Sequence, residues 1–191
     1  NLKLFISRVT VFYVQQTKDA SICFLVAEKV WTTLRIRRRD IYTLFVDCKN
    51  RFWIPTNSKQ GLILIENGKK QTFPVNGKKQ RIHYITVIKE LAPDKYLFGT
   101  LTQELYLYDM YKNSVTHIVL NQLPGAKNKR SGRITGIETD PEGNIYVSTF
   151  GNGLFTFDPR LTLLEHYINN NGLTTPYIYT FVKTSIIPCG H

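Results

Sequence analysis

The chain has 191 residues, of which 42% are apolar and 13% aromatic, so it can build a hydrophobic core and does not have the composition of a disordered protein. Its formal net charge of +11 first suggests a nucleic acid or an acidic membrane surface as partner. However, the charge lies on scattered turns, and residues 134–191 carry 2 Lys or Arg against 5 Asp or Glu, so we expect solvated turns and no nucleic-acid partner.

The predicted elements are short strands. No long segment shows the 3.6-residue period of a helix or the roughly 18–20 apolar residues of a membrane span. In chain order, apolar strands are expected at Leu2–Ile6, Ile41–Val46, Ile85–Glu90, Ile134–Thr139 and Ile178–Lys183. The last four of these begin 44, 49 and 44 residues apart.

A strand, a turn and a further strand follow each of the middle three apolar strands. The clearest copy is "GNIYVSTFGNGLFTFDP" (Gly143–Pro159). The segments "DCKNRFWIPTNSKQGLILIENG" (Asp47–Gly68) and "LAPDKYLFGTLTQELYLYDM" (Leu91–Met110) superimpose on it, and Val11–Val26 is a weaker copy. A period of roughly 40–50 residues with about four short strands per unit is typical of β-propeller blades. The sequence therefore predicts an all-β fold of four-stranded antiparallel blades.

The predicted blades span residues 1–39, which are degenerate, then 40–80, 81–130 and 131–171, and residues 172–184 supply the first strand of a further blade. We expect an incomplete propeller, an open arc of three to four blades, and the alternative is a closed four-bladed ring completed by Ile178–Lys183. In the second strand, the small residues Gly99 and Ser148 suit a tightly packed blade face, whereas Pro55 at the matching place removes a ladder donor.

The segment "ITGIETDPEGNIYVSTFGNGLFTFDP", followed by "INNNGLTTPYIYTFV", resembles the two-component regulator propeller repeat. The resemblance is good over residues 131–183, fair to loose over 40–125 and poor over 1–39, and Leu91 and Thr184 replace the turn Asp of the family. It implies a periplasmic sensor region of a bacterial hybrid sensor histidine kinase that responds to oligosaccharides. Because such sensors use about seven blades per propeller, it also implies further blades of a longer parent chain as partners.

No catalytic residue can be named from the sequence. Gly-x-Ser-x-Gly is absent, the glycines of Pro124–Arg133 have the wrong spacing for a phosphate loop, and the histidines and cysteines lack metal-ligand spacing. The carboxylates Asp47, Asp140 and Asp158 fall at turns, where capping explains them. We therefore expect no enzyme, no metal and no cofactor. A propeller lyase or glycosidase and a protein-binding scaffold are the alternatives.

A binding site on such blades would use the linkers that enter the first strands and the loops between the second and third strands, because these connections converge at one end of the central channel. The candidate ligand-binding residues are Arg133, Tyr177, Asn57, Phe150 and Asn152. The expected ligand is a small polar molecule such as an oligosaccharide. An exposed first strand would also pair with a second copy of the chain, so a homodimer is a further expectation.

Overall fold

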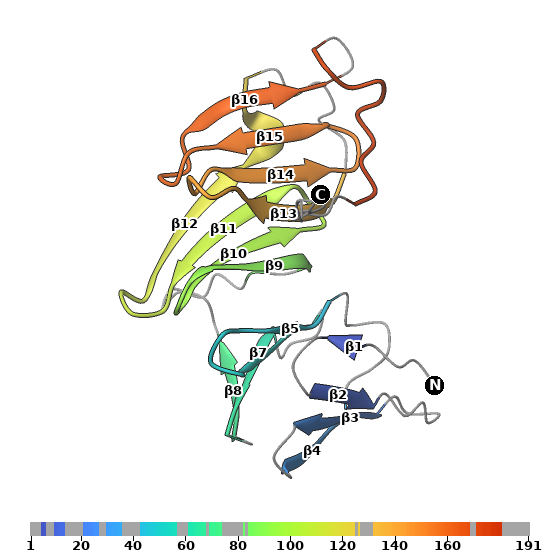
Figure 1. The fold of residues 1–191 in the computed structure, drawn as a ribbon, viewed down its shortest axis with the longest axis vertical. Coiled ribbons are helices and arrows are strands. Elements are labelled where there is room, and N and C mark those ends of the chain that lie inside the picture. Colours follow the sequence, from blue (N-terminus) through green and yellow to red (C-terminus); the bar gives the residue numbers. More distant parts are fainter. Residues whose placement is uncertain are drawn as a thin grey trace, which may run out of the picture. The chain divides into compact units, whose positions relative to one another are not determined.

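A computed structural model describes residues 5–6, 10–13, 21–26, 30–35, 43–56, 61–67, 69–73, 82, 84–124, 126, 132–168 and 171–180 of the chain (Figure 1). The chain divides into two compact units, Asn1–Tyr84 and Ile85–His191.

The first unit contains two four-stranded antiparallel sheets. One consists of β1 (Phe5–Ile6), β2 (Thr10–Tyr13), β3 (Ser21–Val26) and β4 (Val30–Arg35). The other consists of β5 (Phe45–Val46), β6 (Phe52–Pro55), β7 (Leu62–Glu66) and β8 (Lys69–Phe73). In both sheets each strand pairs with the strands that precede and follow it in the chain, so each sheet is a meander.

The second unit repeats this arrangement twice, in the strands coloured green to orange in Figure 1. One meander consists of β9 (Ile85–Ala92), β10 (Lys95–Thr100), β11 (Glu104–Asp109) and β12 (Ser114–Val119). A 3₁₀ turn, η2 (Leu120–Gln122), leads on to β13 (Ile134–Thr139), β14 (Ile145–Thr149), β15 (Leu154–Phe157) and β16 (Leu163–Tyr167). Within the described residues this 3₁₀ turn is the one helical element. The prediction of all-β, four-stranded antiparallel blades is therefore confirmed.

A threonine at the end of the second strand, or directly after it, caps the following turn in three sheets. The Oγ1 atoms of Thr56, Thr100 and Thr149 donate to the carbonyl oxygens of Gly61, Glu104 and Gly153, at 2.7, 3.1 and 2.9 Å. Gly153 has a φ of +70°, and a Cβ there would lie 2.0 Å from the carbonyl oxygen of Tyr167. This turn therefore requires glycine.

An aspartate and an aromatic side chain close the turn between the first and second strands of two sheets. Asp47 accepts a hydrogen bond from Trp53 Nε1 on Oδ2 at 2.8 Å. Asp140 accepts one from the Tyr146 hydroxyl on Oδ2 at 3.1 Å, and its Oδ1 accepts the backbone N–H of Asn144 at 2.7 Å. The predicted turn-capping role of these two carboxylates is thus what their hydrogen bonds show.

The sheet β9–β12 replaces this polar pair with two leucines. Leu97 is fully buried in the core, and Leu91 packs against the same core. A carboxylate at residue 91, which is half-buried, would have no donor in the Leu97 side chain, and removing an unpaired carboxylate from water is costly. The two departures from the repeat therefore compensate each other.

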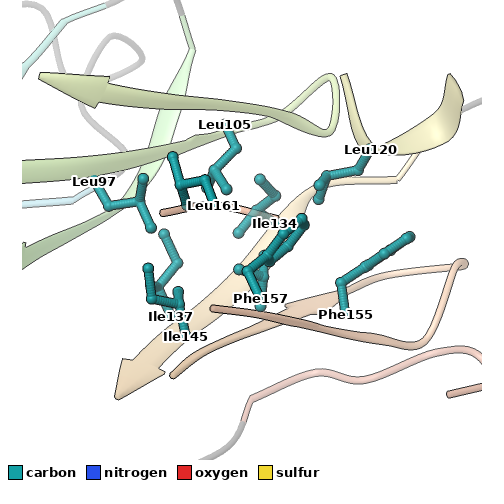
Figure 2. Packing of buried hydrophobic residues seen from close by; sticks show 10 residues of the cluster. Leu97, Leu105, Leu120, Ile134, Ile137, Ile145, Phe155, Phe157 and Leu161 are labelled. Carbon is teal, nitrogen blue, oxygen red and sulfur yellow. The ribbon is translucent and has the colours of Figure 1, made fainter. Parts of the chain in front are cut away.

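A hydrophobic core lies between the sheets β9–β12 and β13–β16 (Figure 2). Leu97 and Leu105 of the first sheet face Ile137, Ile145 and the other apolar side chains of the second. Burial of each such side chain contributes about 1.5–3 kcal/mol. This core joins the two meanders into one unit.

The two sheets approach each other closely at Gly99 of β10, which has no side chain. A Cβ on Gly99 would lie 2.5 Å from Cγ2 of Ile134, the first residue of β13. The predicted close packing at Gly99 is therefore confirmed. Polar links reinforce the contact: Thr86 Oγ1 donates to the carbonyl oxygen of Ile134 at 2.7 Å, and Lys89 Nζ lies 2.5 Å from Glu138 Oε2.

The prediction for Ile41–Val46 was too long. In the described part of that range, β5 contains Phe45 and Val46, and it pairs with Trp53 and Phe52. The continuing ladder would bring residue 43 opposite Pro55, which has no N–H to donate. In the other unit, Ser148 stands at the matching place and pairs with Gly136, so that ladder continues.

The prediction of a strand at Ile178–Lys183 is also corrected within the described residues. Residues 178–180 are not in a strand, and residues 181–183 lie outside the described part. Tyr177 forms an isolated antiparallel bridge with Phe150, and the Ile178 N–H donates to the Thr149 carbonyl oxygen at 3.1 Å. One bridge with the end of β14 does not make a ladder, and Pro176 just before it lacks an N–H.

Candidate functional site

Three segments meet at the end of the sheet β13–β16 where β13 begins. Arg133 precedes β13, Phe150 follows β14, and Tyr177 follows the link after β16. The Phe150 N–H donates to the Arg133 carbonyl oxygen at 2.9 Å. The N–H groups of Gly151 and Gly153 both donate to the carbonyl oxygen of Pro176, at 3.1 and 2.8 Å. Backbone hydrogen bonds therefore fix the three segments to one another.

Their side chains form a cluster that we call the aromatic cluster: Phe150, Tyr177, Tyr179 and Arg133. The Phe150 ring centroid lies 5.1 Å from that of Tyr177 and 5.2 Å from that of Tyr179, with interplanar angles of 58° and 74°. The Arg133 guanidinium carbon lies 5.9 Å from the centre of the Phe150 ring. Tilted and edge-to-face rings and a cation over a ring face are favourable arrangements.

The outer members of the cluster are open to solvent. Tyr177 is 46% exposed and Tyr179 71%, Arg133 is exposed, and Phe150 is half-buried between them. The structure thus brings together Arg133, Phe150 and Tyr177 of the predicted site. Tyr179, which lies in the predicted strand Ile178–Lys183 and was not a predicted site residue, joins them. Their ligand binding stays a prediction.

Asn152 was predicted as a ligand-binding residue of an exposed loop, but the structure buries it. It is 1% exposed, and its Nδ2 donates to Oε1 of Gln103 at 2.7 Å. Its backbone N–H donates to Thr149 Oγ1, and its carbonyl oxygen lies 2.7 Å from Nε2 of His166, whose ring stacks on Phe155. Asn152 therefore positions the loop that carries Phe150, and it is too buried to touch a ligand directly.

Gln103 belongs to the same buried group and comes from the neighbouring sheet. It occupies the β10–β11 loop, has a φ of +59° and is 1% exposed. Its Nε2 has no hydrogen-bond partner among the described residues. A Cβ on Gly132 would lie 2.2 Å from this atom and 1.9 Å from the Phe150 carbonyl oxygen, so only glycine fits between them. Gln103 was not among the residues predicted from the sequence, although the internal repeat aligns Gln103 with Asn152.

Asn57, the remaining predicted residue, lies outside the described residues. The loop that contains Asn57 connects β6 and β7. Its two ends, Thr56 and Gly61, are described, and there the Thr56 hydroxyl donates to the Gly61 carbonyl oxygen.

The perturbed carboxylates lie in turns and not in the aromatic cluster. For Asp140, partial burial acts against ionisation, but hydrogen bonds from Asn144, Tyr146 and Gly143 outweigh it and hold the pKa below its ordinary value. The backbone N–H of Thr162 is the main cause that lowers the pKa of Asp158. Burial, and then the Asp140 carboxylate, raises the pKa of Tyr146. These groups stabilise turns.

Two kinds of feature are absent from the described part of the chain. It contains no group of three or more His, Cys, Asp or Glu side chains arranged to hold a metal ion. Nor does it contain a helix with the length and apolar character needed to cross a bilayer.

Neither a family model nor the sequence of a curated protein matches the chain. Among solved structures, it is similar to the extracellular domain of BT4673 from B. thetaiotaomicron, described once as a one component and once as a hybrid two component system. The first of these comparisons has a TM-score of 0.62 at 18% identity and covers 92% of this chain but 23% of that one. The chain thus spans less than a quarter of that domain.

Two propellers of other kinds are also similar. The WD40 β-propeller domain of Doa1 gives a TM-score of 0.56 at 13% identity, covering 84% of this chain and 50% of that one. A catalytically inactive virginiamycin B lyase from Staphylococcus aureus, solved with quinupristin, gives 0.56 at 13% identity, covering 87% and 54%. At these identities the comparisons establish the β-propeller fold, as the strand repeat predicted.

Proposed function

We propose that the chain is a non-catalytic sensor segment of an extracytoplasmic β-propeller in a two-component signalling protein, and that it binds a small polar ligand such as an oligosaccharide at the aromatic cluster. The observation that supports this most directly is the solvent exposure of Tyr177 and Tyr179 around Phe150 and Arg133.

The cluster has the chemistry that a sugar requires. The C–H face of a pyranose ring is apolar and packs on an aromatic ring, while its hydroxyl groups need donors and acceptors at the edge. A tyrosine offers both, since its ring is apolar and its hydroxyl is polar. The loops that carry the cluster are held by a rigid sheet, and binding residues are commonly found in such loops.

The signalling context of the proposal comes from the fold comparison and the repeat. The extracellular domain of BT4673 has similar blades and is described as part of a one component or a hybrid two component system. Residues 131–183 resemble the repeat of such sensors. A periplasmic location and further blades of a longer parent chain as partners are parts of this proposal.

The lyase comparison supports a second candidate function, a propeller enzyme of the lyase type. One fold carries many functions, so the site must decide between them. A protein-binding scaffold, by analogy with the WD40 domain, is the third candidate, and a homodimer is one form of it.

Isothermal titration calorimetry of the full chain with a panel of oligosaccharides tests the proposal. We expect Tyr177→Ala and Tyr179→Ala to weaken binding about tenfold or more each, because each removes a stacking ring. Tyr111 provides a matched control, since it is 93% exposed and lies in the turn between β11 and β12, outside the aromatic cluster. Tyr111→Ala should bind as the unmodified chain does.

Two results would contradict the proposal. Cleavage of a bound sugar, detected by mass spectrometry of the titrated mixture, would favour the enzyme. Salt-sensitive binding of DNA without a response to any sugar would favour a polyanion-binding surface.

A further inference from the structure

The guanidinium of Arg133 has no anionic partner among the described residues. Its described side-chain contact is with the face of the Phe150 ring, at 5.9 Å from guanidinium carbon to ring centroid. Two other cations of the same unit have a carboxylate beside them: Lys89 pairs with Glu138 across the two sheets, and Arg160 lies beside Asp158. Arg133 is therefore a charge held at the candidate site without a neutralising carboxylate among the described residues.

Its position over the ring prepares it to bind an anion. A guanidinium is a planar fork with five N–H donors. The described side-chain contact of Arg133 is with the Phe150 ring, so these donors stay available for the two oxygens of one carboxylate, which a guanidinium binds in bidentate fashion. The contact with Phe150 also restricts the side chain before a ligand arrives, so less conformational entropy is lost on binding.

We infer that the ligand of the aromatic cluster is an acidic oligosaccharide, whose hexuronic acid carboxylate binds the Arg133 guanidinium while a sugar ring packs on Tyr177 or Tyr179. This inference rests on the proposed function and adds the class of sugar. It uses the two chemistries that the cluster combines: exposed aromatic faces for the apolar side of the pyranose, and a fork of donors for a carboxylate.

Single-stranded nucleic acid also combines rings that stack with an anionic backbone, but the cluster fits it less well. Proteins that bind such strands follow the phosphates with a groove of several positive charges. Among the described residues Arg133 is the single cation of the cluster, and residues 134–191 carry 2 Lys or Arg against 5 Asp or Glu. One guanidinium beside a stacking surface suits one carboxylate.

The inference is tested with matched ligands, of which the decisive pair is an acidic oligosaccharide and its uncharged methyl ester. The full chain is titrated calorimetrically with oligogalacturonates, with their methyl esters, with glucuronate-containing oligosaccharides and with neutral oligosaccharides of the same length. We expect an acid to bind about tenfold or more tightly than its methyl ester, the size of a charge-assisted hydrogen-bonded pair.

The variant Arg133→Gln should abolish this difference, so that acid and ester bind within about threefold of each other, and Arg133→Lys should restore part of it because lysine keeps the charge but not the fork. Arg160→Gln is the control, since Arg160 is exposed in the turn between β15 and β16, and it should leave the acid-to-ester ratio unchanged.

The remaining outcomes contradict the inference, and each of them also shows whether the proposed sugar-binding function fails. Equal binding of acid and ester, or binding of neutral sugars alone, refutes the acidic ligand and leaves the sugar-binding site in place. Binding of an acid that Arg133→Gln does not change refutes the role of Arg133. If no sugar binds but single-stranded DNA does, both proposals fail.

Discussion

Nδ2 of Asn152, in the β14–β15 loop, donates a hydrogen bond of 2.7 Å to Oε1 of Gln103, in the β10–β11 loop of the neighbouring sheet. Both side chains are 1% exposed. The loop that carries Phe150 into the aromatic cluster is thus fixed by a residue 49 positions earlier in the chain. The site of one sheet therefore depends on the packing of the sheet before it.

The first prediction concerns this pair of amides. Gln103→Ala should lower the free energy of unfolding by about 1–3 kcal/mol, because it removes the buried hydrogen bond between Asn152 Nδ2 and Gln103 Oε1. Alanine keeps a Cβ, so the strain of the left-handed backbone at Gln103 is not relieved. Urea unfolding measures the change, with Gln122→Ala, an exposed glutamine of η2, as control.

The double variant Gln103→Ala with Asn152→Ala should cost less than the sum of the two single changes, since each single change already breaks the same hydrogen bond. Strict additivity would show that the two amides do not interact in solution.

The second prediction concerns the close contact between the two sheets at Gly99. Gly99→Ala should destabilise the second unit by about 1–3 kcal/mol, because its Cβ would meet Ile134 Cγ2 at 2.5 Å. Combining it with Ile134→Val, which leaves out Cδ1 and allows the side chain to shift, should recover part of the loss. Thermal unfolding of the three variants decides this, and a Gly99→Ala chain as stable as the unmodified one would contradict the packing.

The third prediction is a loss of stability in acid. The pKa values of Asp140 and Asp158 in the folded state lie below their ordinary values. A carboxyl group with a lowered folded pKa stabilises the fold above its unfolded pKa of about 3.9, and this contribution disappears as the pH falls through the folded pKa. The melting temperature should therefore fall steeply below about pH 4.

The variants Asp140→Asn and Asp158→Asn should each flatten this decline, because an amide does not titrate. Melting curves followed by circular dichroism between neutral and strongly acidic pH provide the measurement. An unchanged slope in both variants would assign the acid transition to other groups.

The fourth prediction compares the two aspartate turns. Asp47 is 4% exposed and also accepts from Arg51 Nε at 2.6 Å, and Arg51 is itself 5% exposed. Asp47→Ala should therefore cost about 3–5 kcal/mol, the cost of breaking a buried ion pair. Asp140→Ala should cost less, because Asp140 is more exposed and its donors are neutral.

Urea unfolding measures both variants, and the fluorescence of Trp53 reports the first unit in a Trp31→Phe background. Equal losses in the two variants would show that burial of the ion pair at Asp47 does not matter.

The local features of this protein followed from its sequence. Alternating apolar residues, a recurring strand–turn–strand segment and the Asp and Gly turns predicted four-stranded meanders, because strand periodicity and turn chemistry depend on residues close together in the chain. Gly99 could be identified as a packing position for the same reason, since its place in the repeat is fixed by its neighbours.

The tertiary structure decided which of the candidate residues share an environment. Arg133, Phe150 and Tyr177 come from three separate connections, and Tyr179 joins them only because residues 176–178 pair with the end of β14 and do not continue a ladder. Asn152 was selected as a loop residue, but the Gln103 side chain of the adjacent sheet buries it. Contacts between repeats depend on how whole sheets pack, and that packing is a property of distant residues that no local pattern contains.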